Sequence, residues 1–228
     1  MLVQLLSHTP EPEQVVAAAA RLCYSDSSID QLLEKSRLDR QVLLNKILEM
    51  GHLSVLEHAS FSFGIEGISR ACSHQLVRHR LASYSQQSQR YFSHREPIAA
   101  VIPPSIAGRP ELRDRFDALL AEIHRTYRDF LEAGVPAEDA RFVLPNAAET
   151  KIVVTMNARE LLHFFNLRCC RRAQWEIRLV ATEMLRLARR AAPLLFAGAG
   201  PGCVGGACPE GKMSCGAAAE VRKEFSNL

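Results

Sequence analysis

The chain has 228 residues, a formal net charge of +3 and a composition that is 47% hydrophobic and 23% charged, which is ordinary for a globular protein with one substantial core. No apolar run approaches the roughly 18 to 20 residues that cross a bilayer, and the N-terminal segment lacks the pattern of a signal peptide. These features exclude a membrane-spanning protein and predict a cytoplasmic one whose seven cysteines stay reduced.

The first half of the chain is predicted to contain three helices and one strand. Thr9 followed by Pro10 is typical of a helix start, and the alanine-rich run after them predicts a helix over 9–24. A second helix is expected over 39–50, with Gly51 placed to cap it. Large apolar residues alternate with small or polar ones over 61–68, which is the period of a half-buried strand. A helix over 69–80 and a polar loop over 83–90 follow.

The second half is predicted to be mainly helical. Residues 110–134 carry a continuous apolar stripe between a proline and a glycine, which predicts a long amphipathic helix. A short helix over 136–143 and a β-branched strand over 151–156 come next. Asn157 is expected to cap the following helix, with Glu160 as its capping-box partner.

The order of these elements indicates the fold class. A last helix is expected over 172–192, and helices and strands are mixed without regular βαβ alternation. This pattern predicts an α+β fold with a mixed or antiparallel sheet flanked by long helices. We expect a single domain over 1–200 and a Gly/Cys-rich tail over 201–228.

The tail contains three thiols, Cys203, Cys208 and Cys215. They could bind zinc or an iron–sulfur centre, but no fourth ligand lies near them and the spacing is not the usual CxxC. A flexible tail of free thiols is the alternative that the sequence favours.

The segment over 67–95 is strongly basic, with five arginines, three histidines and no acidic residue. Its centre is Arg78, His79 and Arg80, followed by serines, glutamines and Arg90. Guanidinium groups bind phosphate through two hydrogen bonds, and Ser and Gln offer neutral donors and acceptors. The cations could instead complement a helix C-terminus, but an acid-free loop rich in hydrogen-bonding groups favours an anionic ligand.

A polar stripe is predicted on the helix that begins at Asn157. Arg159, His163 and Asn166 fall at i, i+4 and i+7 among apolar residues, so they share one face. That face could meet solvent or a bound cofactor. Arg168 follows Arg159 by nine residues, about half a turn round the helix, so we expect it to address a different ligand.

Other kinds of site are not favoured. Ser88 would need a base within hydrogen-bond reach to act as a nucleophile, and none can be assigned. His52 and His58 have no accompanying ligands, so no metal site is predicted. Neither a GxGxxG motif nor a P-loop is present.

With these motifs the chain resembles the flavin-dependent thymidylate synthases. The signature of that family, RHR followed by seven residues and a serine, is here RHR at 78–80, LASYSQQ and Ser88. Further blocks resemble the family in the same order: GHLSVLEHASFSF (51–63), ARFVLP (140–145), TMNAREL (155–161) and NLRCCRRAQWEI (166–177).

The resemblance implies an enzyme that methylates dUMP to dTMP. The carbon would come from 5,10-methylenetetrahydrofolate, and the reducing equivalents from NADPH through FAD, without a cysteine nucleophile. The resemblance also implies a homotetramer whose active sites are shared between subunits. No nucleic-acid or membrane partner is expected.

Roles for particular residues follow from the same resemblance. Arg168 would be catalytic, activating the uracil ring by stabilising negative charge at N3 and its flanking oxygens. Many relatives have Glu where this chain has Gln86. The residues implied at FAD are Ser54, Arg78, His79, Arg80, Gln86, Asn157, Arg159 and His163. Those implied at dUMP are Gln75, Arg78, Gln86, Gln87, Ser88, Gln89, Arg90, Arg141 and Arg168.

Two other function classes stay open on the residues alone. A nucleic-acid-binding module would use the basic segment on phosphates, but only 7% of the residues are aromatic and no reading motif is present. A non-catalytic flavin or nucleotide sensor would keep the binding arginines without the chemistry, and the presence of Arg168 and Ser88 argues against it.

Overall fold

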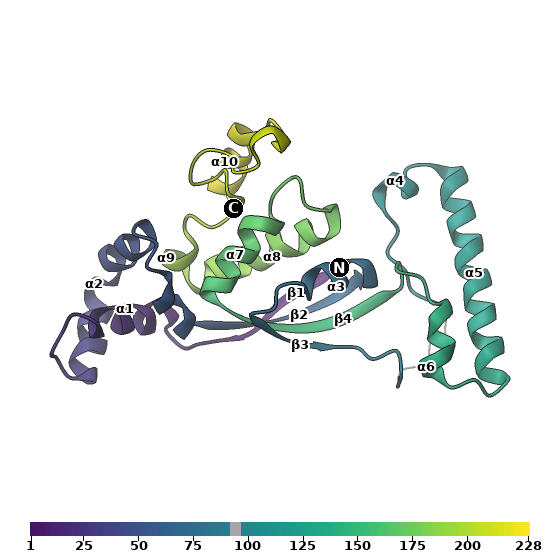
Figure 1. Cartoon of the computed structure of the whole chain (residues 1–228), viewed down its shortest axis with the longest axis horizontal. Coiled ribbons are helices and arrows are strands. Elements are labelled where there is room, and N and C mark those ends of the chain that lie inside the picture. Colours follow the sequence, from purple (N-terminus) through teal and green to yellow (C-terminus); the bar gives the residue numbers. More distant parts are fainter. Residues whose placement is uncertain (92–96) are drawn as a thin grey trace. The chain divides into compact units, whose positions relative to one another are not determined.

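The computed structural model describes residues 1–91 and 97–228, and its centre is a four-stranded sheet (Figure 1). Neighbouring strands follow the order β1-β2-β4-β3. Their bounds are Leu2–His8 for β1, Ser60–Ser69 for β2, Ala82–Gln86 for β3 and Glu149–Asn157 for β4.

Side-chain pairs fix the register of the two central strands. Ser62 and Thr155 share a hydrogen bond of 2.7 Å between their hydroxyls, and Lys151 Nζ lies 3.5 Å from Glu66 Oε2. Residue numbers therefore rise along β2 as they fall along β4, so the two strands are antiparallel. The α+β class and the antiparallel pairing are as predicted.

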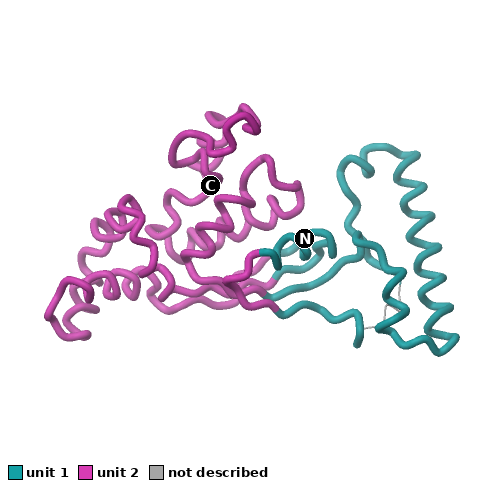
Figure 2. Tube along the Cα trace, in the orientation of Figure 1, with its two compact units in different colours: residues 1–2, 65–78, 85–153 teal, residues 3–64, 79–84, 154–228 magenta. Residues whose placement is uncertain are grey.

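The chain divides into two compact units (Figure 2). Unit 1 comprises 1–2, 65–78 and 85–153, and unit 2 comprises 3–64, 79–84 and 154–228. Residues 201–228 belong to unit 2, and the expected domain division at residue 200 stays a prediction.

The helical elements fall into one unit or the other. Those of unit 1 are α3 (Arg70–Leu76), α4 (Pro104–Ala107), α5 (Pro110–Glu132), α6 (Ala137–Ala140) and the 3₁₀ turn η2 (Arg141–Val143). Those of unit 2 are α1 (Pro12–Leu22), α2 (Ile29–Glu49), η1 (Leu53–His58), α7 (Ala158–Arg168), α8 (Trp175–Ala191), α9 (Pro193–Phe196), η3 (Gly211–Met213) and α10 (Ala218–Ser226). Among the described residues, none of these helices combines the length and apolar character needed to cross a membrane.

An aromatic cluster forms part of the core of unit 2. The ring of Phe196 meets Phe61 of β2 at 5.4 Å and Phe165 of α7 at 5.9 Å, both edge-on. All three rings are fully buried, so this cluster packs α7 and α9 against the sheet. The packing fixes the position of α7, which carries Arg159, Glu160, His163 and Arg168.

Two strands were missed by the sequence interpretation, which placed a polar loop over 83–90. β1 and β3 are the two outer strands of the sheet. Residues of β3 alternate between half-buried and exposed, and its exposed positions are Ser83 and Ser85. Outer strands tolerate polar residues because one of their edges faces away from the sheet. The polar composition of β3, which is also typical of a loop, is therefore compatible with its position.

Three helix bounds also differ from the prediction. α1 begins at Pro12 instead of residue 9, because the chain up to His8 is in β1. α2 begins at Ile29 with a capping box between Ser28 and Gln31, and the predicted start near residue 39 is a kink inside this helix. α3 ends at Leu76, so Arg78, His79 and Arg80 lie beyond its last turn.

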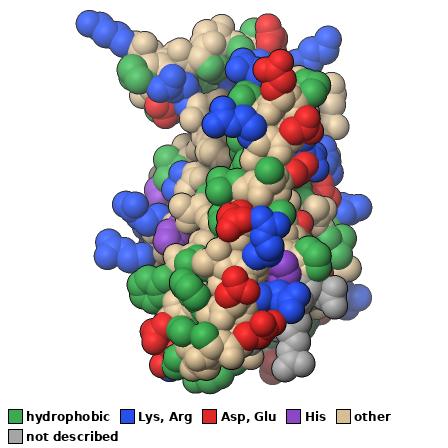
Figure 3. All heavy atoms as spheres, turned by 90° about the vertical axis from the view of Figure 1, so that its right-hand side faces the viewer, with side chains coloured by type: hydrophobic (Ala, Val, Ile, Leu, Met, Phe, Trp, Pro, Cys, Tyr) green, Lys and Arg blue, Asp and Glu red, His purple; other side chains and the backbone are tan. Residues whose placement is uncertain are grey.

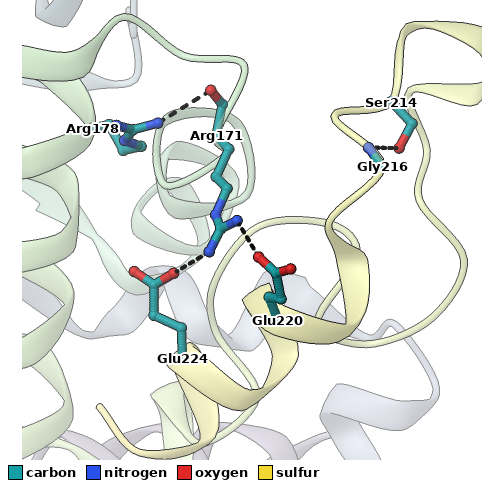
Figure 4. Close-up of polar contacts among 6 residues, drawn as sticks. All are labelled: Arg171, Arg178, Ser214, Gly216, Glu220 and Glu224. Carbon is teal, nitrogen blue, oxygen red and sulfur yellow. Dashed lines mark hydrogen bonds and ion pairs between the residues drawn. The ribbon is translucent and has the colours of Figure 1, made fainter.

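The C-terminal segment is anchored by arginines (Figure 4). Arg171 contacts Glu220 at 2.8 Å and Glu224 at 3.3 Å, one turn apart on α10, and its carbonyl accepts a hydrogen bond from Arg178. Arg189 donates to three backbone carbonyls, one of them in α10. The segment therefore has defined partners, which the sequence did not predict. Among the described residues, no group of three metal-binding side chains is found.

Candidate active site

One cavity in unit 2 contains several of the residues implied at a cofactor. Its volume is about 740 Å³, within the range of ligand pockets. Of the predicted FAD residues it contains Asn157, Arg159 and His163, whereas Ser54 is exposed on η1 without lining it. The remaining lining residues are Leu53, Glu57, Leu81, Glu160, Leu162 and Asn166. The three leucines and Glu57 were not singled out from the sequence.

The N-terminus of α7 forms one side of this cavity. Asn157 caps the helix, with Oδ1 accepting the Glu160 N–H at 2.9 Å, and the N–H of Ala158 donates to the carbonyl of Ala59 just after η1. Arg159 then reaches back to Glu57 on η1, with 2.5 Å between Nη1 and Oε1. The local signals that predicted the helix start thus also place the polar stripe beside η1.

Glu160 does not complete the predicted capping box. Its carboxylate is buried and lies 3.2 Å from Nδ1 of His79. On the other side of the same ring, Nε of Arg168 donates to Nε2 of His79 at 3.0 Å. Glu160, His79 and Arg168 therefore form a continuous chain of side chains within unit 2.

Burial controls the ionisation of this chain. Desolvation first, and then the nearby charges of Arg168 and His163, lower the pKa of His79 to about 4. Burial raises the pKa of Glu160, an effect that His163 opposes. Burial also raises the pKa of Tyr84, whose hydroxyl donates to the His79 carbonyl at 2.7 Å. At neutral pH the imidazole is uncharged.

A second polar cluster lies in unit 1 around Glu138. Its carboxylate pairs with Arg90 at 2.8 Å, and its carbonyl accepts a hydrogen bond of 3.0 Å from Nε of Arg141. Burial and the charge of Arg141 both lower the pKa of Arg70, so a third guanidinium is nearby. The structure thus brings together two residues implied at dUMP. Glu138 and Arg70 were missed because nothing local connects them to Arg90.

The side-chain amide of Gln86 acts as a hydrogen-bond donor, which an ionised carboxylate at this position could not do. Its amide nitrogen donates to the hydroxyls of Ser73 at 2.8 Å and Thr150 at 3.2 Å. A Glu side chain, as in many relatives, would have to accept from these hydroxyls instead. The amide is therefore accommodated by its neighbours in unit 1.

The other predicted residues have weaker side-chain contacts. Ser88 Oγ accepts the Arg90 N–H at 3.1 Å, and no described base meets it. Gln75 donates to the Ala71 carbonyl at 3.4 Å. The N–H of Gln87 donates to the carbonyl of Lys151, and Gln89 is half-buried.

Arg78 and Arg80 are exposed, and no carboxylate within residues 1–91 and 97–228 pairs with either. Arg78 and Arg90 belong to unit 1 and Arg168 to unit 2. That these arginines share one pocket therefore stays a prediction.

Surface charge in Figure 3 is mixed. Lys and Arg side chains are interspersed with Asp and Glu over the face shown, and no large area of one sign covers it. A nucleic-acid-binding face would be expected to concentrate positive charge.

Comparison with known proteins covers the whole chain. Residues 4–194 match a family model described as thymidylate synthase complementing protein. The chain is 60% identical to the flavin-dependent thymidylate synthase of Geobacter sulfurreducens, over 100% of this chain and 99% of that protein. It is 48% identical to that of Pyrococcus horikoshii, over 99% and 97%, and 46% identical to that of Clostridium tetani, over 98% and 96%.

Proposed function

The chain belongs to the flavin-dependent thymidylate synthase family, and on this premise we propose that it converts dUMP to dTMP with 5,10-methylenetetrahydrofolate as carbon donor and NADPH as reductant. It is accordingly a methyltransferase with FAD as its cofactor. The observation that carries the proposal is the 60% identity over the whole chain. The test is dTMP formation with each reactant omitted in turn.

FAD fits the cavity at α7. Leu53, Leu81 and Leu162 offer apolar walls for a flat ring, while Arg159 and His163 offer donors for polar edges or phosphates. A phosphate at Arg159 would have to displace Glu57. Both side chains are about half exposed, so breaking their ion pair costs little free energy. FAD supplies, when bound, the hydride transfer between the nicotinamide and the substrate carbon. Asn157, which caps α7, would hold the start of this helix in place in the cavity wall.

The cluster around Glu138 suits the nucleotide phosphate. Arg90 and Arg141 present guanidinium groups to one region of unit 1, and Glu138 neutralises only one of them. A phosphate that replaced the carboxylate would gain charge-assisted hydrogen bonds from both arginines. Glu138 would then act as a placeholder that keeps the arginines in position.

Replacing Glu138 with Gln should lower KM for dUMP, because the phosphate would no longer compete with a carboxylate for Arg90. The pair is about half exposed, so the expected decrease is about two- to fivefold, the size of a surface ion pair. Steady-state kinetics with varied dUMP measure it. Glu132→Gln, which removes a similarly exposed carboxylate paired with Arg128, is the matched control. A higher KM in Glu138→Gln would show that the carboxylate assists binding instead.

Arg168 is proposed to activate the uracil ring. Its Nε is occupied by His79, which leaves the terminal nitrogens of the guanidinium to approach the pyrimidine. A fixed positive charge there would stabilise negative charge developing at N3 and its flanking oxygens. The neighbouring Cys169 is unsuited to act as a nucleophile, because burial raises its pKa to about 12 and keeps the thiol protonated.

A homotetramer is the proposed assembly. The predicted apolar stripe of α5 contains eight residues, but only Tyr127 is buried in the single chain. Leu119 is 57% exposed and Phe130 39% exposed. An apolar helix face of this length is unfavourable in water, and a second copy of the chain would cover it. The stripe comprises Leu112, Phe116, Leu119, Leu120, Ile123, Tyr127, Phe130 and Leu131.

A further inference from the structure

The chain Glu160–His79–Arg168 assigns a role to the histidine of the RHR motif. We infer that His79 is a positioning residue that, supported by Glu160, fixes the guanidinium of Arg168 in the orientation needed for the reaction. This inference rests on the proposed function in one respect, the role of Arg168. It departs from the expectation that the His79 side chain is a flavin ligand.

The two hydrogen bonds of the His79 ring determine which of its nitrogens carries the proton. An arginine Nε–H can only donate, so Nε2 of His79, 3.0 Å away, must be an unprotonated acceptor. The ring proton then lies on Nδ1, which donates to Oε1 of Glu160 at 3.2 Å. Both ring nitrogens are engaged. No ring nitrogen remains for a cofactor.

Packing prevents the ring from turning away. His79 and Glu160 are each only 6% exposed. Phe164 packs against the histidine in an edge-to-face pair, with ring centroids 4.9 Å apart and planes at 86°, and the ring of His163 lies 5.8 Å away. Tyr84 holds the His79 backbone through its carbonyl. The ring is therefore fixed at both its backbone and its edges.

Burial and the surrounding charges keep His79 neutral. Burial disfavours an imidazolium most, and Arg168 and His163 on α7 add to the effect, so the pKa of His79 falls to about 4. Glu160 on α7 and Tyr84 on β3 are the other titratable groups facing it. A protonated ring could not accept from Arg168, so the low pKa preserves the contact throughout the neutral range.

The functional consequence concerns geometry. A guanidinium is planar, so a hydrogen bond at Nε fixes the direction of both terminal nitrogens. Without it, Arg168 would remain close to its place but could adopt several orientations. A displacement of about 1 Å in a catalytic group can cost on the order of a hundredfold in rate.

Two substitutions of His79 separate this role from a general structural one. His79→Asn places its amide near the position of Nδ1 and leaves Arg168 without an acceptor, whereas His79→Gln can place an oxygen near the position of Nε2. We expect His79→Asn to lower kcat about ten- to a hundredfold, with the Kd for FAD and the KM for dUMP within threefold of wild type. His79→Gln should recover most of kcat.

Three outcomes would contradict this role of His79 or of Arg168. If His79→Asn lost FAD while turnover per bound flavin stayed normal, His79 would be a flavin ligand. Equal losses of kcat in the Asn and Gln variants would leave only a structural role. If Arg168→Ala kept normal turnover, the proposed role of Arg168 would fail, and the state of the ring would be judged separately.

That separate measurement uses no substrate. Nitrogen-15 NMR of flavin-free protein, with the His79 signals assigned by comparison with His79→Asn, reports which ring nitrogen carries the proton. We expect the Nδ1-protonated form to persist down to about pH 4. Protonation on Nε2, or titration near the ordinary value for histidine, would contradict the hydrogen-bond chain.

Discussion

Arg168→Ala is expected to fold and to keep FAD but to form dTMP at least about a hundredfold more slowly. The guanidinium is the fixed charge at the end of a buried hydrogen-bond chain, and it is half-buried, so water replaces it poorly. Loss of one such donor at a site of developing charge costs about 2.7–4 kcal/mol in the barrier. The residues that line the cavity proposed for FAD are untouched. The effect should therefore appear in kcat.

Arg172→Ala is the matched control for this experiment. Arg172 lies four residues later and its side chain is exposed, so its removal should leave turnover within about twofold of wild type. The comparison is made per bound flavin, from dTMP formed under saturating reactants. Near-normal turnover in Arg168→Ala would remove the catalytic assignment, and loss of FAD would move Arg168 to cofactor binding.

The double variant Leu119→Asp, Phe130→Asp on α5 should dissociate the proposed tetramer and abolish activity. Both residues are on the apolar stripe, and neither is buried in the single chain. Each substitution would therefore bury an unpaired carboxylate only if another subunit covers the stripe. If active sites are shared between subunits, the dissociated protein should also lose dTMP formation.

Light scattering coupled to size-exclusion chromatography measures the mass of the species. Ala118→Asp introduces the same charge at an exposed position of α5 outside the stripe and should leave the assembly unchanged. A wild-type protein that elutes as an active monomer would contradict the proposed assembly. An intact tetramer in the double variant would place the subunit contact elsewhere.

Elements with strong local signals could be predicted from the sequence. α5 begins at Pro110 and has a continuous apolar stripe, and α7 begins after Asn157, whose side chain forms the expected cap. The capping box of Ser28 and Gln31 was equally local, yet the first half of α2 was missed because the helix is weakly amphipathic. Of the two outer strands, β3 was missed because its residues are polar, which an edge strand allows. β1 is mostly apolar, but it is short and its large side chains do not alternate strictly with polar ones.

The candidate site was predictable only where its residues share one element. Arg159 and His163 were identified from helical spacing, and both line the same cavity. The pair of His79 and Glu160 spans 81 positions, and the pair of Arg90 and Glu138 spans 48. Such contacts depend on how strands and helices pack, which spacing along the chain does not reveal. Glu160 was for that reason interpreted as a helix cap.

Arg90, Arg141 and Arg168 are proposed to serve one reaction, the conversion of dUMP to dTMP. The most direct measurement is tritium release from dUMP labelled at C5, with the purified protein, FAD, NADPH and 5,10-methylenetetrahydrofolate, and with each omitted in turn. We expect tritium release coupled to dTMP formation in the complete mixture, and no dTMP formation when the folate or the reductant is omitted. Flavin bound to the protein with no dTMP formed in the complete mixture would contradict it.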